Sequence, residues 1–175
     1  MQQRVTSKRV VKGPAPPQCF VQQRLGAKDC LIATVATVTG IDYTKIAEAF
    51  GIPLNQRGIP DADALGPGIY LNDAVIPLYR LGWVATPLIT KEHPELPDDL
   101  RQQHPDRYPS SDLTKSLIAG RKAIVSYIDE DETVGAHSLV WNGKEAIDCT
   151  DGVIVDLDGL TLIEALLMGR AAAKG

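Results

Sequence analysis

The fold of this protein depends most on the segment VQQRLGAKDCLIATVATVTG (residues 21–40), in which a cysteine precedes a run of apolar and small residues. Asp29 is of a type that caps helix N-termini, and Gly40 suits the position just past a helix end. Many residues between them are β-branched and weak helix formers, so a strand over 31–39 is the alternative. The nearly all-round apolar character predicts a central helix that is packed on several sides and stabilised by burial.

Cys30 lies at the start of this predicted helix. Unpaired backbone N–H groups and the positive end of the helix dipole favour the thiolate there, and a cationic histidine would favour it further. The thiolate is the nucleophilic form of cysteine. A lone cysteine on an apolar helix is more often a small core residue, so a catalytic role for Cys30 requires partners elsewhere in the chain.

Length and composition predict one soluble globular domain. The chain has 175 residues, of which 44% are hydrophobic and 23% charged, and it is long enough to bury about two-thirds of its unfolded surface. It contains no run of about 20 apolar residues for a membrane helix, and no apolar segment that would make the basic N-terminus a signal peptide. Three cysteines, Cys19, Cys30 and Cys149, fit a reducing compartment. We therefore expect a cytoplasmic protein or a component of a larger assembly.

Charge is distributed unevenly along the chain. The net charge of −4 argues against nucleic acid as the main partner. All charged residues before Asp29 are basic: Arg4, Lys8, Arg9, Lys12, Arg24 and Lys28. Residues 1–18 end in the proline-rich GPAPP and predict a basic N-terminal arm, followed by a domain over 19–175. A solvated arm is the simpler interpretation, and docking on an acidic partner or a nucleic-acid surface is the alternative.

Apolar spacing predicts the remaining elements. Helices are expected over 43–50, over 70–81 with an irregularity at Pro77, and over 112–120, with a strand over 83–88. Residues 55–68 and 91–111 are predicted to be loops, and the second of these is a candidate flap over a site. Further strands are expected over 123–128, 136–141, 144–149 and 153–156, with a turn over 129–132 and a last helix over about 161–173. Helices followed by an antiparallel sheet predict an α+β domain.

The second chemical signal is a hairpin. Asn142-Gly143 is typical of a two-residue turn, and counting outward from that turn places His137 opposite Asp148. A carboxylate beside an imidazole orients the ring and stabilises its cationic form. Cys30, His137 and Asp148 are therefore the predicted nucleophile, base and orienting group. A shifted register would give the orienting role to Asp151 or Asp156.

This order of residues resembles the papain-like cysteine peptidases. The shared features are Asp29-Cys30 before an apolar helix, a Gly135-Ala136-His137 strand and a short β return to Asp148. Over about residues 20–170 the chain is most similar to the bacteriocin-processing, double-glycine peptidases. The resemblance implies a papain-like fold in which a central helix packs on a C-terminal antiparallel sheet. It also implies a cysteine that attacks a carbonyl, a histidine base and an orienting aspartate.

The resemblance further implies that a glutamine upstream of the cysteine helps to stabilise the oxyanion, a role that falls on Gln23. In the family this glutamine normally lies slightly closer to the cysteine, which leaves Gln22 as an alternative. The family commonly has glycine directly after the cysteine, whereas this chain has Leu31.

The expected function is a thiol hydrolase that cleaves a peptide or protein substrate at a peptide or related amide bond through an acyl-enzyme. Acyl transfer and deamidation would use the same triad. The alternative is a papain-like domain with weak or no activity that serves as a structural or interaction component of a larger assembly. Cys30, His137 and Cys149 are competent zinc ligands, but the chain has no CxxC or HxxxH pair, and we expect neither a metal nor a cofactor.

Overall fold

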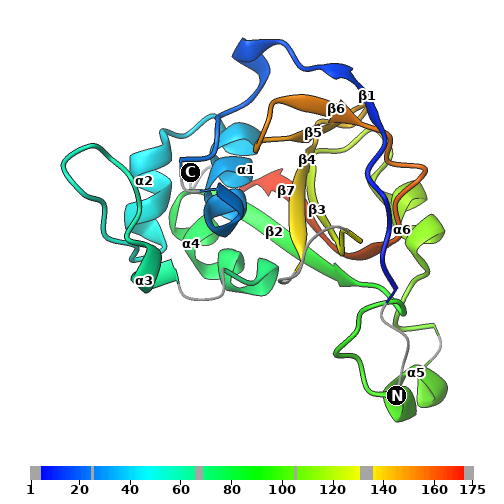
Figure 1. Ribbon diagram of the computed structural model, residues 1–175. Coiled ribbons are helices and arrows are strands. Elements are labelled where there is room, and N and C mark those ends of the chain that lie inside the picture. Colours follow the sequence, from blue (N-terminus) through cyan, green and yellow to red (C-terminus); the bar gives the residue numbers. More distant parts are fainter. Residues whose placement is uncertain (1–4, 25, 66–68, 105, 131–135, 172–175) are drawn as a thin grey trace.

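The computed structural model describes residues 5–24, 26–65, 69–104, 106–130 and 136–171. Its strands form one antiparallel sheet of seven strands in the order β1-β6-β5-β4-β3-β7-β2 (Figure 1). The strands are β1 (Val11–Pro14), β2 (Trp83–Ile89), β3 (Ala123–Tyr127), β4 (His137–Trp141), β5 (Ala146–Asp148), β6 (Val153–Val155) and β7 (Leu162–Arg170). The predicted α+β class is confirmed.

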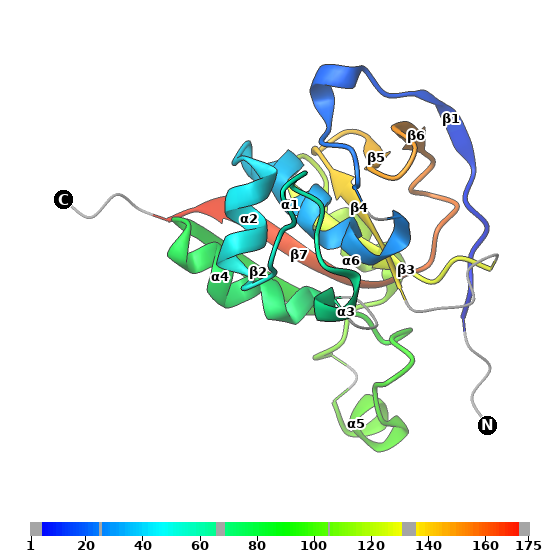
Figure 2. The same cartoon turned by 60° about the vertical axis from the view of Figure 1, so that its left-hand side comes forward.

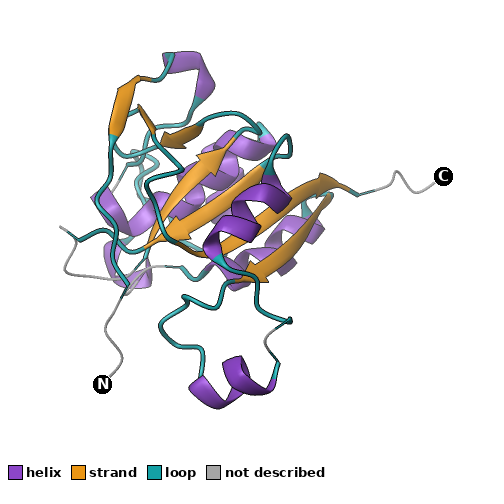
Figure 3. Ribbon diagram, turned by 90° about the vertical axis from the view of Figure 1, so that its right-hand side faces the viewer, coloured by secondary structure: helices purple, strands orange, loops and turns teal. Residues whose placement is uncertain are grey.

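The helices cover both faces of the sheet. The first face carries α1 (Cys30–Thr39), α2 (Tyr43–Ala49), α3 (Ala62–Leu65) and α4 (Val75–Arg80), and the second carries α6 (Ser111–Ile118) (Figures 2 and 3). Short 3₁₀ turns lie at η1 (Pro17–Cys19), η2 (Gly26–Asp29) and η3 (Leu71–Ala74). Two apolar cores result, one between the sheet and the α1 group and one under α6.

α1 is the predicted central helix, and the alternative of a strand is excluded. Nine of its ten residues are buried, because it packs on α2 and on β3 and β4 of the sheet. Three threonines add hydrogen bonds from their hydroxyls to carbonyls three or four residues earlier: Thr34 to Leu31, Thr37 to Ala33 and Thr39 to Val35. Gly40 ends the helix at a φ of 71°, in the left-handed region that glycine favours.

Helix length bears on whether the chain could cross a membrane. In the part of the chain that the structure describes, no single helix is both long and apolar enough to do so. α1 and α2 reach that length and composition only as a pair, and the pair is bent by 117°.

Most of the other predicted elements are confirmed with small shifts in their ends. Asp42 caps α2 by accepting a hydrogen bond of 2.8 Å from the backbone N–H of Thr44. The predicted helix over 70–81 is divided into η3 and α4. Pro77 lies in the first turn of α4, where its missing N–H removes no α-helical hydrogen bond.

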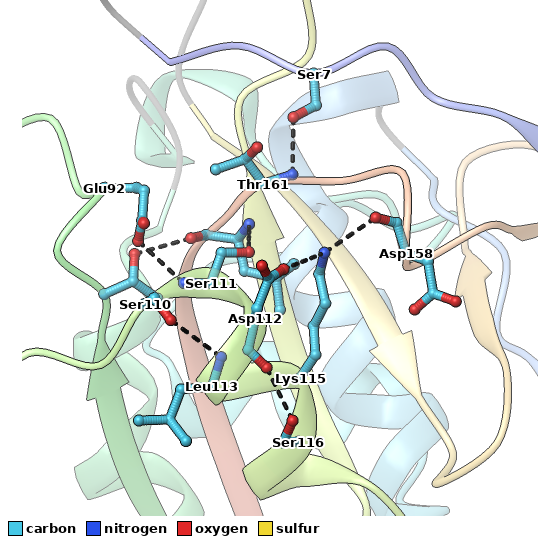
Figure 4. Close-up of polar contacts among 12 residues, drawn as sticks. Ser7, Glu92, Ser110, Ser111, Asp112, Leu113, Lys115, Ser116, Asp158 and Thr161 are labelled. Carbon is cyan, nitrogen blue, oxygen red and sulfur yellow. Dashed lines mark hydrogen bonds and ion pairs between the residues drawn. The ribbon is translucent and has the colours of Figure 1, made fainter.

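The loop over 91–111 is an excursion that carries one short helix at its tip, α5 (Asp98–Gln103) (Figure 1). The base of the loop is closed by a 3.0 Å bond from the backbone N–H of Lys91 to the carbonyl of Pro109. Glu92 also accepts a bond from the backbone N–H of Ser111 at the start of α6 (Figure 4). Its role as a flap remains a prediction.

The helix predicted over 161–173 is wrong, because this segment forms the long strand β7 between β3 and β2. Its sequence, LIEALLMGR, is rich in good helix formers. A strand with apolar cover on both faces also reads as a continuous apolar run, so local pattern cannot separate the two. The start of β7 is fixed from outside the strand, by Ser7 and Ser111 hydroxyls that accept 2.8 Å bonds from the backbone N–H groups of Thr161 and Leu162 (Figure 4).

The N-terminal segment is not a solvated arm where the structure describes it. Val11–Pro14 forms the edge strand β1, which pairs with β6. Lys12 pairs with Asp156 at 2.9 Å, and the exposed Lys8 with Glu130 at 3.7 Å. The acidic groups that this basic segment contacts thus belong to the same chain.

Candidate functional site

The hairpin before the candidate site is longer than predicted. The observed register pairs Trp141 with Ala146, so the loop has four residues, 142–145, and not two. The side chain of Asn142 accepts bonds of 2.9 and 2.8 Å from the backbone N–H groups of Lys144 and Glu145, which makes the asparagine the anchor of a wider loop. The prediction that His137 and Asp148 pair directly across the strands is therefore wrong.

The two side chains nevertheless meet. Extending the observed register places Asp148 opposite Leu139, two residues along β4 from His137. A shift of two residues leaves every side chain on its original face of the sheet, so the contact becomes diagonal and is not lost. His137 Nε2 lies 3.0 Å from Asp148 Oδ2, and both residues are buried.

Electrostatics in this pair favour the charged forms of both groups. Burial by itself lowers the pKa of His137, but hydrogen bonds to Asp148 and Cys30 and the charges of both partners outweigh it and raise the pKa to about 10. Burial raises the pKa of Asp148, yet His137 and the backbone N–H of Thr150, 2.8 Å from Oδ1, hold it well below its usual range. The pair is an imidazolium and a carboxylate at neutral pH.

Cys30 is the first residue of α1 and is 8% exposed. Its side chain lies close enough to the imidazole of His137 to help raise the pKa of the ring. The structure thus brings together the three residues that the sequence predicted, in the order thiol, imidazole, carboxylate.

Asp29 occupies the N-cap position of α1, as predicted, but its side chain makes no capping hydrogen bond to the helix. Its buried carboxylate accepts bonds from the backbone N–H of Arg24 at 2.7 Å and from the hydroxyl of Tyr43 at 2.6 Å. Burial, together with this hydrogen bond, raises the pKa of Tyr43. Asp29 therefore fixes the turn by which the chain enters α1, and so fixes the place of Cys30.

The upstream glutamines have different environments. Gln23 is 9% exposed, and its amide bridges Asp29, at 3.4 Å from Nε2, and the hydroxyl of Thr150. Gln22 is exposed, and its side-chain N–H donates to the carbonyl of Thr150. Of the two candidates for the oxyanion role, only Gln23 is buried beside the residues that hold Cys30 and Asp148.

The remaining candidates are engaged elsewhere. Cys149 is fully buried, its sulfur lies 3.5 Å from the hydroxyl of Thr37, and burial raises its pKa to about 12. Asp151 and Asp156, the alternatives to Asp148, contact Arg9 and Lys12 respectively. Within the described residues, no three His, Cys, Asp or Glu side chains are arranged to hold a metal ion. Gly135 of the histidine motif lies outside the described residues.

Three contacts of the site were not predicted. Arg9 donates through Nη1 to Asp148 Oδ2, the oxygen that also contacts His137. Tyr127 packs edge-on against the His137 ring, with centroids 5.9 Å apart and planes at 85°. Thr150 donates to Asp148 from two residues downstream, a pattern that a turn after an aspartate makes recognisable in sequence. No local pattern marks Arg9, which is 139 residues away from its partner.

No protein-family model and no curated protein sequence matches this chain. The chemistry of the site is then the guide to function. A thiol beside an imidazole can lose its proton to the ring and become a nucleophile, and a carboxylate on the far nitrogen fixes the tautomer and supports the cation that results.

Proposed function

We propose that this protein is a thiol hydrolase with a papain-like fold, which cleaves a peptide or related amide bond through an acyl-enzyme on Cys30. The observation that carries the proposal is the buried contact of His137 with Asp148, at 3.0 Å, beside Cys30, which helps to raise the pKa of His137. The resemblance of the Asp29-Cys30 and His137 segments to the papain-like peptidases supports the same assignment.

The proposed reaction needs only these groups and water. With the proton already on His137, the thiolate of Cys30 attacks the substrate carbonyl carbon to form a C–S bond and an oxyanion. Collapse of this intermediate breaks the C–N bond, and the leaving amine takes the proton from the imidazolium. His137 then removes a proton from water, which attacks the thioester, releases the carboxylic acid and restores the thiolate beside the imidazolium.

Asp148 has two tasks in this scheme. By accepting from Nε2–H it leaves Nδ1 to exchange a proton with sulfur, and its charge stabilises the imidazolium that forms at each step. The raised pKa of His137 keeps the ring protonated at neutral pH, ready to donate to the leaving amine.

The oxyanion requires donors beside the sulfur. Backbone N–H groups at the start of α1 are one source, and Gln23 is the second. The family commonly has glycine at the position of Leu31. The Leu31 side chain is 1% exposed and packs into the first core, so it is directed away from solvent.

Reaction with iodoacetamide at pH 6, followed by peptide mapping, tests the dyad without a known substrate. The exposed Cys19 serves as an internal reference for an accessible thiol, and the fully buried Cys149 as one that is inaccessible. We expect Cys30 to be alkylated faster than Cys19 in spite of its burial. His137→Ala should slow the reaction of Cys30 by at least about tenfold, because the cation that stabilises the thiolate is lost.

Hydrolysis is then tested with a positional library of fluorogenic peptidyl amides. Cys30→Ala should abolish cleavage, and Cys149→Ala should retain it. Mass analysis of the products separates hydrolysis from acyl transfer and from release of ammonia out of a glutamine or asparagine side chain. If Cys30 reacts no faster than Cys19 and is insensitive to His137→Ala, the dyad is not functional and the structural or interaction component is the better hypothesis.

A further inference from the structure

The N-terminal segment contributes a cation to the site. One guanidinium nitrogen of Arg9 contacts Asp148 Oδ2, and the other lies 3.0 Å from Asp151 Oδ2. The side chain of Arg9 is 28% exposed, whereas that of Asp148 is 1% exposed. Arg9 therefore reaches inward from the surface to a carboxylate that solvent hardly contacts.

The backbone on both sides of Arg9 is held in place. Ser7 donates from its backbone N–H to the carbonyl of Ile128 at 2.9 Å, and the carbonyl of Val10 accepts from Asp156 at 2.8 Å. Strand β1 begins one residue later and pairs with β6. Because these bonds do not involve the Arg9 side chain, a change of that side chain leaves the path of the backbone supported.

We propose that Arg9 is a positioning residue of the site, which holds the Asp148 carboxylate in place for His137 and sets the pH range over which His137 exchanges its proton. This inference rests on the proposed function, since it assigns Arg9 a task only in a site that uses His137 as a base. It also makes residues 7–14 a part of the site.

Geometry gives the first half of the task. Asp148 Oδ2 accepts hydrogen bonds from both His137 and Arg9, and Oδ1 accepts one from the backbone N–H of Thr150. Donors at both oxygens prevent the carboxylate from rotating away from the imidazole. A planar guanidinium that bridges two carboxylates is well suited to this, since its nitrogens donate in fixed directions.

Charge gives the second half. Burial lowers the pKa of Arg9, but Asp148 and Asp151 outweigh it and raise the pKa, so Arg9 stays charged at any working pH. A permanent cation on the carboxylate oxygen that His137 contacts offsets part of the negative charge that stabilises the imidazolium. The charged and titratable groups around His137 are Asp148, Cys30, Arg9 with Asp151, and Tyr127, whose hydroxyl donates to Asp129. Of these, Arg9 is the one that opposes protonation of the ring.

The test compares three substitutions. Arg9→Met removes the charge and the donors but keeps the length, Arg9→Lys keeps the charge without the bridge, and Asp151→Asn removes the outer partner while Arg9 stays. The pKa of His137 is measured by NMR of its ring in a Cys30→Ala background, where the contribution of the thiol is absent. The rate of Cys30 alkylation against pH is measured with Cys30 present.

We expect Arg9→Met to raise the pKa of His137 by at least about half a unit, because a nearby positive charge is lost. Alkylation of Cys30 should slow several-fold, because Asp148 is held less firmly. Arg9→Lys should leave the pKa of His137 within about 0.3 units, because lysine keeps the charge. It should still slow alkylation of Cys30, because lysine cannot bridge Asp148 and Asp151 as the guanidinium does. Asp151→Asn should lower the pKa or leave it unchanged.

An unchanged His137 pKa and an unchanged alkylation profile in Arg9→Met would overturn the inference. The proposed function would survive that result as long as His137→Ala still slows Cys30. If His137→Ala, with Arg9 left unchanged, has no effect on the rate of Cys30 alkylation, the proposed function itself is overturned. Should Arg9→Met not fold, Arg9→Lys decides, since an alkylation rate equal to that of the unmodified chain would show that the bridge has no positioning role.

Discussion

The chain contains the same dipeptide, Asp-Cys, at two places: Asp29-Cys30 before α1 and Asp148-Cys149 at the end of β5. Both aspartates are fully buried, and both cysteines are buried. The two dipeptides are thus alike in sequence and in burial. Asp29-Cys30 nevertheless supplies a candidate nucleophile, whereas Asp148-Cys149 supplies a candidate orienting carboxylate.

The difference lies in the donors that each carboxylate receives. The described donors to Asp29 include three uncharged groups, the backbone N–H of Arg24, the hydroxyl of Tyr43 and the amide of Gln23. Asp148 is held by two groups that carry charge, His137 and Arg9, besides the backbone of Thr150. Uncharged donors fix a chain path whatever the pH, whereas a titrating imidazole couples the carboxylate to proton transfer.

The cysteines differ in the same way. Cys30 lies at a helix start and helps to raise the pKa of His137. Cys149 lies in the core against Thr37, and its raised pKa keeps it a neutral thiol. Burial alone makes a cysteine inert, and an imidazole partner is what reverses this.

Asp148→Asn should have the largest effect on chemistry. The amide cannot support the imidazolium and allows the wrong tautomer of His137, so hydrolysis and the alkylation of Cys30 at pH 6 should fall by about 100-fold or more. Asp156→Asn is the matched control and should retain the rate, because the Asp156 carboxylate contacts Lys12 and the backbone N–H of Asp158, away from the His137 pair. Similar rates for the two variants would mean that Asp148 has no orienting role.

Asp29→Asn should have its main effect on stability. In the asparagine an NH2 group replaces one carboxylate oxygen, so a buried donor that bonds to oxygen in the unmodified chain would face N–H groups. The free energy of unfolding should fall by about 2 kcal/mol, the cost of leaving buried donors unsatisfied. Urea unfolding measures this. Asp42→Asn is the control, because asparagine caps a helix about as well as aspartate and Asp42 is exposed; it should change stability by less than about 0.5 kcal/mol. An Asp29→Asn variant as stable as the control would contradict the structural role of Asp29.

The smallest expected effect is the dependence of stability on alkaline pH. The pKa of His137 is about 10 in the folded chain and about 6.5 when unfolded, so its contribution is complete below about pH 6.5 and is lost as pH rises toward 10. Between pH 6.5 and 9.5 the free energy of unfolding should fall by at least about 1.4 kcal/mol, the value of one pKa unit.

A Glu164→Gln background sharpens this measurement. Burial and the charge of Glu95 raise the pKa of Glu164 to about 7, so its own contribution also declines as pH rises, between about 4.5 and 7. With that group removed, His137→Gln should flatten the remaining alkaline slope. A slope that persists in the double variant would assign the effect to other groups.

The sequence by itself determined α1, α2, α6, the strands β2 to β6 and the pairing of Cys30 with His137 and Asp148 as candidates. Each of these follows from short-range signals: apolar periodicity in the helices, a glycine after α1 and short apolar runs between turn residues in the strands. Even the error at the Asn142 loop was harmless to the site, because a shift of two residues preserves the face of a strand.

Only the tertiary structure decided β1, β7 and the place of Arg9. The segment before Pro14 has no apolar periodicity and becomes a strand because β6 offers an unpaired edge. The segment from Leu162 has the composition of a helix and becomes a strand because β3 and β2 both pair with it. Arg9 meets a carboxylate 139 residues away. Such contacts depend on which distant edges and charges the fold brings together, and a local pattern holds no information about them.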